Sequence, residues 1–201
     1  MKLYYSPGAC SLAPHIILQE TNTDFDLIKV DFASKMTEHG EDFTKINPHG
    51  YVPALQLDNG DVLTEGVAIM QYLADLSPQA NLVPENGTFK RAKLYEKLNY
   101  LTSELHKGFA PLFSDVSDTS KQKAKENLNN KFSYIDSVLA EKPYLLGNDF
   151  SVADAYLFVI SGWTKLTGID LSKWVHVTSF VEKISKRNAV QKALKAEGLL
   201  S

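Results

Sequence analysis

The sequence predicts two parts, a small mixed α/β domain followed by an all-helical domain. Residues 1–80 mix short apolar runs typical of strands with helical patches, whereas residues 88–201 show helical periodicity almost throughout. The stretch 77–87 between them holds two prolines, two asparagines and a glycine, which break regular structure. We therefore expect domains at 1–80 and 88–201, joined by a linker at 81–87.

The first part is expected to run in the order β-α-β, a connecting turn, and then β-β-α. The predicted segments are strands at 2–5, 26–31, 54–57 and 62–63, helices at 11–20 and 64–75, and a helical turn at 43–46. Thr64 is typical of an N-cap residue for the second helix. This order predicts a small mixed sheet with helices on its faces.

The second part is expected to be a bundle of helices. They are predicted at 90–113, 121–140, 151–163, 177–186 and 190–196. Ser151 and Asp154 form a capping-box pattern ahead of the most apolar helix, with Asp in place of the usual Glu. We assign this pair to folding and stability rather than to chemistry.

Composition excludes several classes of protein. The chain has 201 residues, 44% of them hydrophobic and 22% charged, with a net charge of −3, which is typical of a globular protein. No apolar run approaches the roughly 20 residues of a membrane span, and no signal peptide pattern is visible. Arginine occurs only at positions 91 and 187, so nucleic acid is not an expected partner. The lone Cys10 excludes an internal disulfide and a cysteine metal cluster, and points to a reducing compartment.

Cys10 is the first candidate for chemistry. It follows a strand and a Pro-Gly turn and lies at the start of a helix, where unpaired N–H groups and the helix dipole favour an anion. The position is expected to lower the pKa of the thiol. The alternative is a small buried side chain without function. Ala13 stands where a second thiol would complete a dithiol motif, so only one-thiol chemistry remains.

Two backbone features point to a peptide-like ligand. A cis bond before Pro53 would fix the backbone of Val52 so that it could pair with a ligand as a strand does, whereas a trans bond would make Pro53 an ordinary edge residue. In Thr64–Gly66, the first N–H groups of the helix could bind a carboxylate and Glu65 an amine. The alternative is an ordinary capped helix.

A further candidate cluster lies on the first helix of the second part. Asn99, Ser103 and His106 are spaced i, i+4 and i+7, so they are expected to share one polar, half-exposed face. The leucines of that helix point about 140° away. A solvated polar face without function is the alternative.

These motifs, taken together and in order, resemble bacterial beta-class glutathione S-transferases over the whole chain. The segments that carry the resemblance are 1–12 (MKLYYSPGACSL), 47–55 (NPHGYVPAL), 63–73 (LTEGVAIMQYL), 98–100 (LNY), 104–107 (ELHK) and 150–156 (FSVADAY). Tyr51 departs from the pattern, because glutamine is usual before the Val-Pro pair. The resemblance implies a thioredoxin-like N-terminal domain, an all-α C-terminal domain, a homodimer and a cis Pro53.

The resemblance also assigns roles. Cys10 would lie beside the sulfur of glutathione, Lys35 would hold the glycine carboxylate, and Val52 would pair with the cysteinyl backbone. Glu65 and Gly66 would hold the γ-glutamyl end, and His106 would lie near the sulfur. The full glutathione-binding set is Cys10, Lys35, Tyr51, Val52, Pro53, Glu65, Gly66, Asn99, Ser103, Glu104, Leu105 and His106, with Cys10 and His106 catalytic. The expected pocket for an apolar co-substrate comprises Lys107, Phe109, Phe113 and Trp163. Ser11 is a secondary candidate for thiol activation, and Tyr5 is not carried over.

The function implied is conjugation of the glutathione thiolate to small hydrophobic electrophiles, that is, detoxification in the cytoplasm. Glutathione is then a co-substrate, and neither a permanently bound cofactor nor a metal is expected. A glutaredoxin-like thiol transferase or glutathione peroxidase acting through Cys10 is one alternative. A non-catalytic carrier of apolar ligands is another.

Overall fold

The computed structural model describes residues 1–200, which form two compact units. The first comprises Met1–Asn81 together with the C-terminal residues from Lys186 onward, and the second comprises Leu82–Ser185. The C-terminal residues from Lys186 were expected in the helical domain, but they pack with the N-terminal unit. The chain thus returns to the first unit after the second is complete, a long-range contact that local periodicity cannot indicate.

The first unit is built on a four-stranded sheet with the order β2-β1-β3-β4. Strands β1 and β2 are parallel, while β3 is antiparallel to both β1 and β4. The strand bounds are Lys2–Tyr5 for β1, Asp26–Lys29 for β2, Ala54–Gln56 for β3 and Val62–Thr64 for β4. This confirms the predicted mixed sheet and the β-α-β, β-β-α order.

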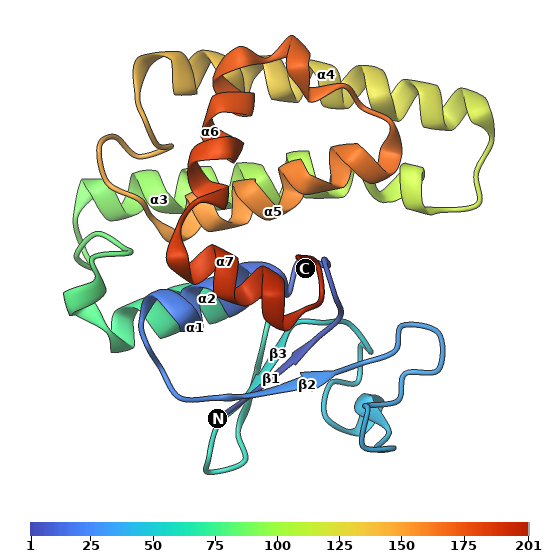
Figure 1. The fold of residues 1–201 in the computed structure, drawn as a ribbon, viewed down its shortest axis with the longest axis vertical. Coiled ribbons are helices and arrows are strands. Elements are labelled where there is room, and N and C mark those ends of the chain that lie inside the picture. Colours follow the sequence, from blue (N-terminus) through green and yellow to red (C-terminus); the bar gives the residue numbers. More distant parts are fainter. Residues whose placement is uncertain (201) are drawn as a thin grey trace. The chain divides into compact units, whose positions relative to one another are not determined.

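Helices α1, α2 and α7 complete the first unit (Figure 1). Their bounds are Leu12–Glu20, Gly66–Leu76 and Asn188–Ala196, with 3₁₀ turns at Phe43–Lys45 and Pro78–Ala80. Helix α7 lies against α1. Glu20 of α1 binds Arg187, just before α7, through both carboxylate oxygens at 2.6 and 3.0 Å. Such a bidentate pair adds directional contact to the apolar packing of the two helices.

The second unit is all helical. Its helices are α3 (Phe89–Tyr100), a π-helical segment (Leu101–His106), α4 (Asp118–Glu141), α5 (Val152–Thr167) and α6 (Val175–Ser185), with 3₁₀ turns at Ala110–Phe113 and Leu171–Lys173. Both hydrogen bonds of the capping box at Ser151 and Asp154 are present, so the predicted pattern forms. No helix within residues 1–200 has the length and apolar character to cross a membrane.

The predicted helix over 90–113 is wrong as a single element. Helix α3 changes to π-helical winding at Leu101, and a separate 3₁₀ turn begins at Ala110. Proline lacks the N–H that a continuing helix needs, so Pro111 suits the first turn of a new segment. At Gly108 an added Cβ would lie 2.8 Å from a methyl carbon of Leu128, so any side chain there would have to displace this leucine of α4.

Candidate active site

The loop between β1 and α1 is fixed from within. The Ser11 hydroxyl donates to the carbonyl of Ser6 and accepts from the Ser6 N–H, both at 3.2 Å. Ser11 is fully buried, and both capacities of its hydroxyl are used inside the loop. This side chain therefore shapes the turn that carries Cys10, and its geometry gives no support to the secondary role in thiol activation.

Cys10 lies at the end of that loop and retains part of its surface exposed. Burial of the sulfur raises the pKa of the Cys10 thiol to about 11, although the backbone N–H groups of Cys10 and Ser11 act to lower it. The negative charge of Glu65 raises it further. The expected lowering of the pKa is wrong, because desolvation outweighs the helix terminus. Cys10 is thus a neutral S–H donor at pH 7.

The backbone at Val52 meets Cys10 directly. The Val52–Pro53 peptide bond is cis, and the Cys10 sulfur donates to the Val52 carbonyl at 3.4 Å. Within residues 1–200 no group of the protein accepts a hydrogen bond from the Val52 N–H. A backbone donor of this kind, beside a thiol, is suited to strand-like pairing with a peptide.

The start of α2 lies beside the same proline. Helix α2 begins at Gly66, and its N-cap is Glu65 with φ of 67°, which no side chain caps. The expectation that Thr64 is the N-cap is wrong, because Thr64 pairs with Ala54 as the last residue of β4. An added Cβ on Gly66 would lie 3.4 Å from Pro53, so glycine permits this close approach. The uncapped N–H groups remain as donors for a carboxylate.

Lys35 approaches this region from the loop after β2. Its ammonium donates to the carbonyl of Gly50 at 3.1 Å and lies 5.8 Å from the centre of the Tyr51 ring. Lys35 therefore lies beside Gly50 and Tyr51, the two residues that precede Val52 in the sequence. The structure thus brings Cys10, Glu65 and Gly66 to the Val52–Pro53 cis bond, and it places Lys35 against Gly50 and Tyr51, which precede that bond in the chain.

The predicted site residues of the second unit differ in how far they are exposed to solvent. Asn99 and Ser103 are exposed, with the Ser103 hydroxyl bonded to the Asn99 carbonyl at 2.9 Å. Glu104 forms an ion pair with Lys131. The Leu105 side chain is fully buried in the core, so only its backbone could meet a ligand.

His106 does not share the exposed face of Asn99 and Ser103, so that expectation is wrong. The π-helical segment bonds i to i+5, which places more residues in a turn and rotates His106 away from that face. Its ring lies edge-on to Trp163, with centroids 4.7 Å apart, and its Nδ1 is 2.5 Å from the Tyr156 hydroxyl. Burial lowers the pKa of His106 to about 4, with a smaller contribution from Lys107. The imidazole is therefore neutral at pH 7.

The four residues expected to line a co-substrate pocket divide into buried and exposed ones. Phe109 is fully buried among Phe132, Phe113 and Trp163, so it belongs to the core and supports the others from behind. Phe113 is 56% exposed, and Lys107 is exposed too. Phe113 therefore provides exposed apolar surface, whereas Trp163 is buried and packs against both Phe113 and His106.

Two buried residues that contact the candidate site, Glu197 and Tyr156, were not predicted from the sequence. Glu197, after α7, accepts from the Gly8 N–H at 2.9 Å and lies 2.9 Å from Nδ1 of the fully buried His15. Tyr156, whose hydroxyl lies against His106, belongs to the motif at 150–156, but the sequence assigned it no role at the site. A capping pattern or a helical period is local in sequence, whereas the Gly8–Glu197 contact spans 189 residues, so no sequence signal indicates it.

Comparison with protein families gives two matches. Residues 1–75 match the model described as Glutathione S-transferase, N-terminal domain. Residues 100–188 match the model described as Glutathione S-transferase, C-terminal domain. The gap between these matches includes the linker region inferred from the sequence.

Individual relatives are similar over their full length. Glutathione S-transferase GstA of Escherichia coli O157:H7 is 46% identical over 99% of this chain and 100% of its own. Among solved structures, a ternary complex of BphK, a bacterial GST, has 52% identity and a TM-score of 0.97, covering 99% of this chain and 100% of that one. A sphingomonad glutathione S-transferase complexed with glutathione has 49% identity and a TM-score of 0.96, with both chains covered completely. The beta-class enzyme of Sphingomonas chungbukensis has 48% identity and a TM-score of 0.97, again with full coverage of both.

Proposed function

This chain belongs to the glutathione S-transferase family, and on that basis we propose how its residues bind glutathione and use its thiol. The protein is a glutathione transferase with a thioredoxin-like N-terminal domain and a helical C-terminal domain. We propose that it conjugates glutathione to small hydrophobic electrophiles. The observation that carries the proposal is the position of Cys10, 3.4 Å from the backbone of Val52 at the cis bond.

The charges around Cys10 match those of glutathione. Glutathione has two carboxylates, one amine and one thiol. The N–H groups at the start of α2 suit the γ-glutamyl carboxylate, Glu65 suits its amine, and Lys35 suits the glycine carboxylate. The Val52 N–H suits the cysteinyl carbonyl. Bound in this way, the tripeptide places its sulfur beside Cys10.

The neutral Cys10 thiol then acts as a donor. Because its pKa is about 11, Cys10 keeps its proton at pH 7, and when glutathione binds it can turn its one S–H hydrogen bond from the Val52 carbonyl to the glutathione sulfur. Such a bond favours the thiolate of glutathione, which is the nucleophile that attacks the electrophilic carbon. Glutathione gives up its thiol proton to solvent, its sulfur forms a bond to the electrophilic carbon, and the leaving group departs with the electron pair of the broken bond.

We propose His106 as the second catalytic group, with Asn99 and Ser103–His106 contributing to glutathione binding. The neutral imidazole of His106 can donate an N–H hydrogen bond to the sulfur of glutathione and so favour its thiolate form. Phe113 and Trp163 would provide the apolar surface for the electrophile. The family resemblance supports a homodimer. We place the enzyme in the cytoplasm, where glutathione is kept reduced.

The alternatives identified from the sequence are not favoured. A glutaredoxin-like thiol transferase needs Cys10 as a thiolate, and its raised pKa opposes that form. A non-catalytic carrier has no use for the donors and charges gathered at the cis bond. Thiol-disulfide exchange through Cys10 would therefore be at most slow beside conjugation.

The test compares conjugation and exchange in the same variants. We expect wild-type turnover of glutathione with an activated aryl halide, and about tenfold lower kcat/KM in Cys10→Ala, because one hydrogen bond to a charged sulfur is lost. Cys10→Ser keeps a donor and should lie between the two. Exchange of glutathione with a model disulfide should be slow in all three.

Two results would contradict these roles. Absence of conjugation with several electrophiles, while calorimetry still detects bound glutathione, would remove the proposed activity. Fast disulfide exchange that vanishes in Cys10→Ala, together with a mass corresponding to a Cys10–glutathione adduct, would favour the thiol transferase instead.

Tyr156→Phe is expected to lower kcat several-fold while KM for glutathione stays within twofold. The hydroxyl at 2.5 Å holds the His106 ring in one orientation, and its loss frees the imidazole. The ¹⁵N chemical shifts of His106, assigned with a His106→Gln sample, should change from a single tautomer to a mixture. Tyr144→Phe removes another half-buried hydroxyl as a control. An unchanged tautomer in Tyr156→Phe would show that the hydroxyl does not orient the ring.

A further inference from the structure

Lys35 is held by an unusually exposed pair of aromatic rings. Its ammonium lies 5.6 Å from the centre of the Phe32 ring and 5.8 Å from that of Tyr51. Both distances are within the range in which a cation is attracted to a ring face. Phe32 is 49% exposed and Tyr51 68% exposed, although large aromatic side chains usually bury most of their surface. These two side chains, here called the aromatic pair, contact the cation rather than the core.

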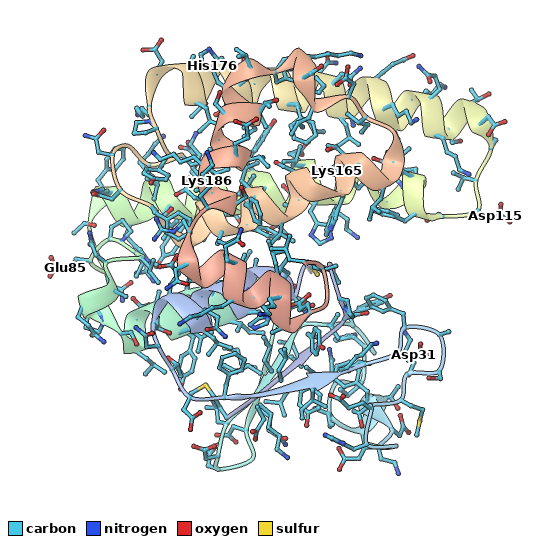
Figure 2. The ribbon with its side chains drawn as sticks, viewed as in Figure 1. Asp31, Glu85, Asp115, Lys165, His176 and Lys186 are labelled. Carbon is cyan, nitrogen blue, oxygen red and sulfur yellow. The ribbon has the colours of Figure 1, made fainter. Side chains whose placement is uncertain are left out.

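Hydrogen bonds in the turn that begins at Asp31 fix the backbone conformation of Lys35. The Asp31 carboxylate, at the start of the loop and labelled in Figure 2, accepts from the N–H groups of Ala33 and Ser34 and from the Ser34 hydroxyl. These bonds hold the pKa of Asp31 below its usual value. Lys35 follows with φ of 58°, and its N–H bonds to the Asp31 carbonyl at 3.0 Å. The turn therefore sets the direction in which the lysine leaves the backbone.

Gly50 provides the surface along which the lysine lies. Its φ is 63°, and an added Cβ would lie 3.4 and 3.5 Å from Cδ and Cε of Lys35. The Gly50 carbonyl takes one of the three ammonium donors at 3.1 Å. Within residues 1–200 no carboxylate forms an ion pair with Lys35. The half-buried Lys35 ammonium therefore has no acidic partner within these residues and retains two N–H donors. These donors can receive an anion from outside the chain.

We propose that Phe32 and Tyr51 are positioning residues, whose rings attract the Lys35 ammonium and hold it over Gly50 to receive the terminal carboxylate of glutathione. This rests on the proposed function, in which Lys35 binds that carboxylate. Contact with the rings restricts the side chain of a flexible lysine and shields part of its ammonium from water. Both effects strengthen its pairing with a carboxylate, since an exposed lysine otherwise gains little from such a pair.

The test measures two ligands by calorimetry: glutathione, and its analogue in which the glycine carboxyl is an amide. Tyr51→Leu is expected to weaken glutathione binding about three- to tenfold, with the amide analogue unaffected within twofold. Tyr51→Phe keeps the ring and should behave as wild type, whereas Phe32→Leu should resemble Tyr51→Leu. In turnover, KM for glutathione should rise while kcat is retained.

A double-mutant cycle tests whether the rings act through the lysine. Lys35→Met retains the stem and removes the charge, so it should abolish the preference for glutathione over the amide. Tyr51→Leu added to Lys35→Met should then have no further effect on binding. Equal weakening of both ligands by Tyr51→Leu, or additive effects of the two substitutions, would overturn the proposal.

The outcomes separate this proposal from the function on which it rests. If wild type binds no glutathione, both fall. If wild type binds glutathione and Lys35→Met loses the preference for the carboxylate, the proposed site stands. If glutathione affinity in that case were unchanged by Phe32→Leu and Tyr51→Leu, only the positioning role of the aromatic pair would be overturned.

Discussion

Asp154→Ala is expected to lower the free energy of unfolding by about 3–5 kcal/mol, because three buried donors lose their acceptor. The Asp154 carboxylate, fully buried, accepts from the Leu145 N–H at 2.9 Å and from the N–H and hydroxyl of Ser151 at 2.8 and 2.7 Å. These bonds close the turn before α5 and start the most buried helix of the second unit. Thermal and urea denaturation measure the loss, which corresponds to about 10 °C in Tm.

Two matched variants separate burial from charge. Asp149→Ala removes an exposed carboxylate that lies 3.9 Å from the Lys90 ammonium, and its stability should change by less than about 0.5 kcal/mol. Ser151→Ala removes one of the three donors and should cost about 1 kcal/mol. Glutathione affinity of the folded Asp154→Ala protein should equal that of wild type. A variant of normal stability would refute the structural role of the capping box.

The same carboxyl predicts a pH dependence. Burial raises the pKa of Asp154 to about 6, above its ordinary value of 3.8, despite the hydrogen bonds that lower it. A folded pKa above the unfolded one contributes stability below pH 3.8 that is lost as the pH rises through about 6. The stability difference between wild type and Asp154→Ala should therefore be larger at pH 4 than at pH 8. The opposite trend would show that the hydrogen bonds outweigh desolvation.

Glu197→Ala is the second substitution with a large expected effect, a loss of about 3 kcal/mol in the free energy of unfolding. It removes the carboxylate that accepts from the Gly8 N–H and that lies against the fully buried Nδ1 of His15, whose Nε2 already has no partner within residues 1–200. Each buried polar group left unpaired costs about 1–3 kcal/mol. Because Gly8 lies two residues before Cys10, KM for glutathione should rise as well.

The control for Glu197 is its amide. Glu197→Gln keeps one oxygen to accept a hydrogen bond, so its loss should be about 1 kcal/mol and its KM close to that of wild type. Glu182→Ala, at an exposed glutamate, should leave both quantities unchanged. Denaturation curves and glutathione titrations check these expectations. If Glu197→Ala and Glu197→Gln were equally stable, the contact with Gly8 and His15 would carry little energy.

Local patterns accounted for the elements that depend on nearby residues. The strand at Lys2–Tyr5, the apolar stripe of α4 and the capping box at Ser151 all follow from spacing within one element, and all three are present. The motifs of the first unit include Cys10 and Gly66, which contact Val52 and Pro53 at the cis bond. In contrast, the single helix over 90–113 and the Thr64 cap were wrong, because packing against α4 and pairing with β3 override local preference.

Sequence by itself determined the family and the order of strands and helices, and it predicted the glutathione-binding side chains that we propose for the first unit. Tertiary structure alone decided the charge states and the supports of these groups. Burial, which depends on every neighbour, makes Cys10 and His106 neutral at pH 7, reversing what the helix terminus favours for Cys10. Contacts distant along the chain place Glu197 on Gly8 and Tyr156 on His106, since folding joins residues whose separation leaves no periodic signal.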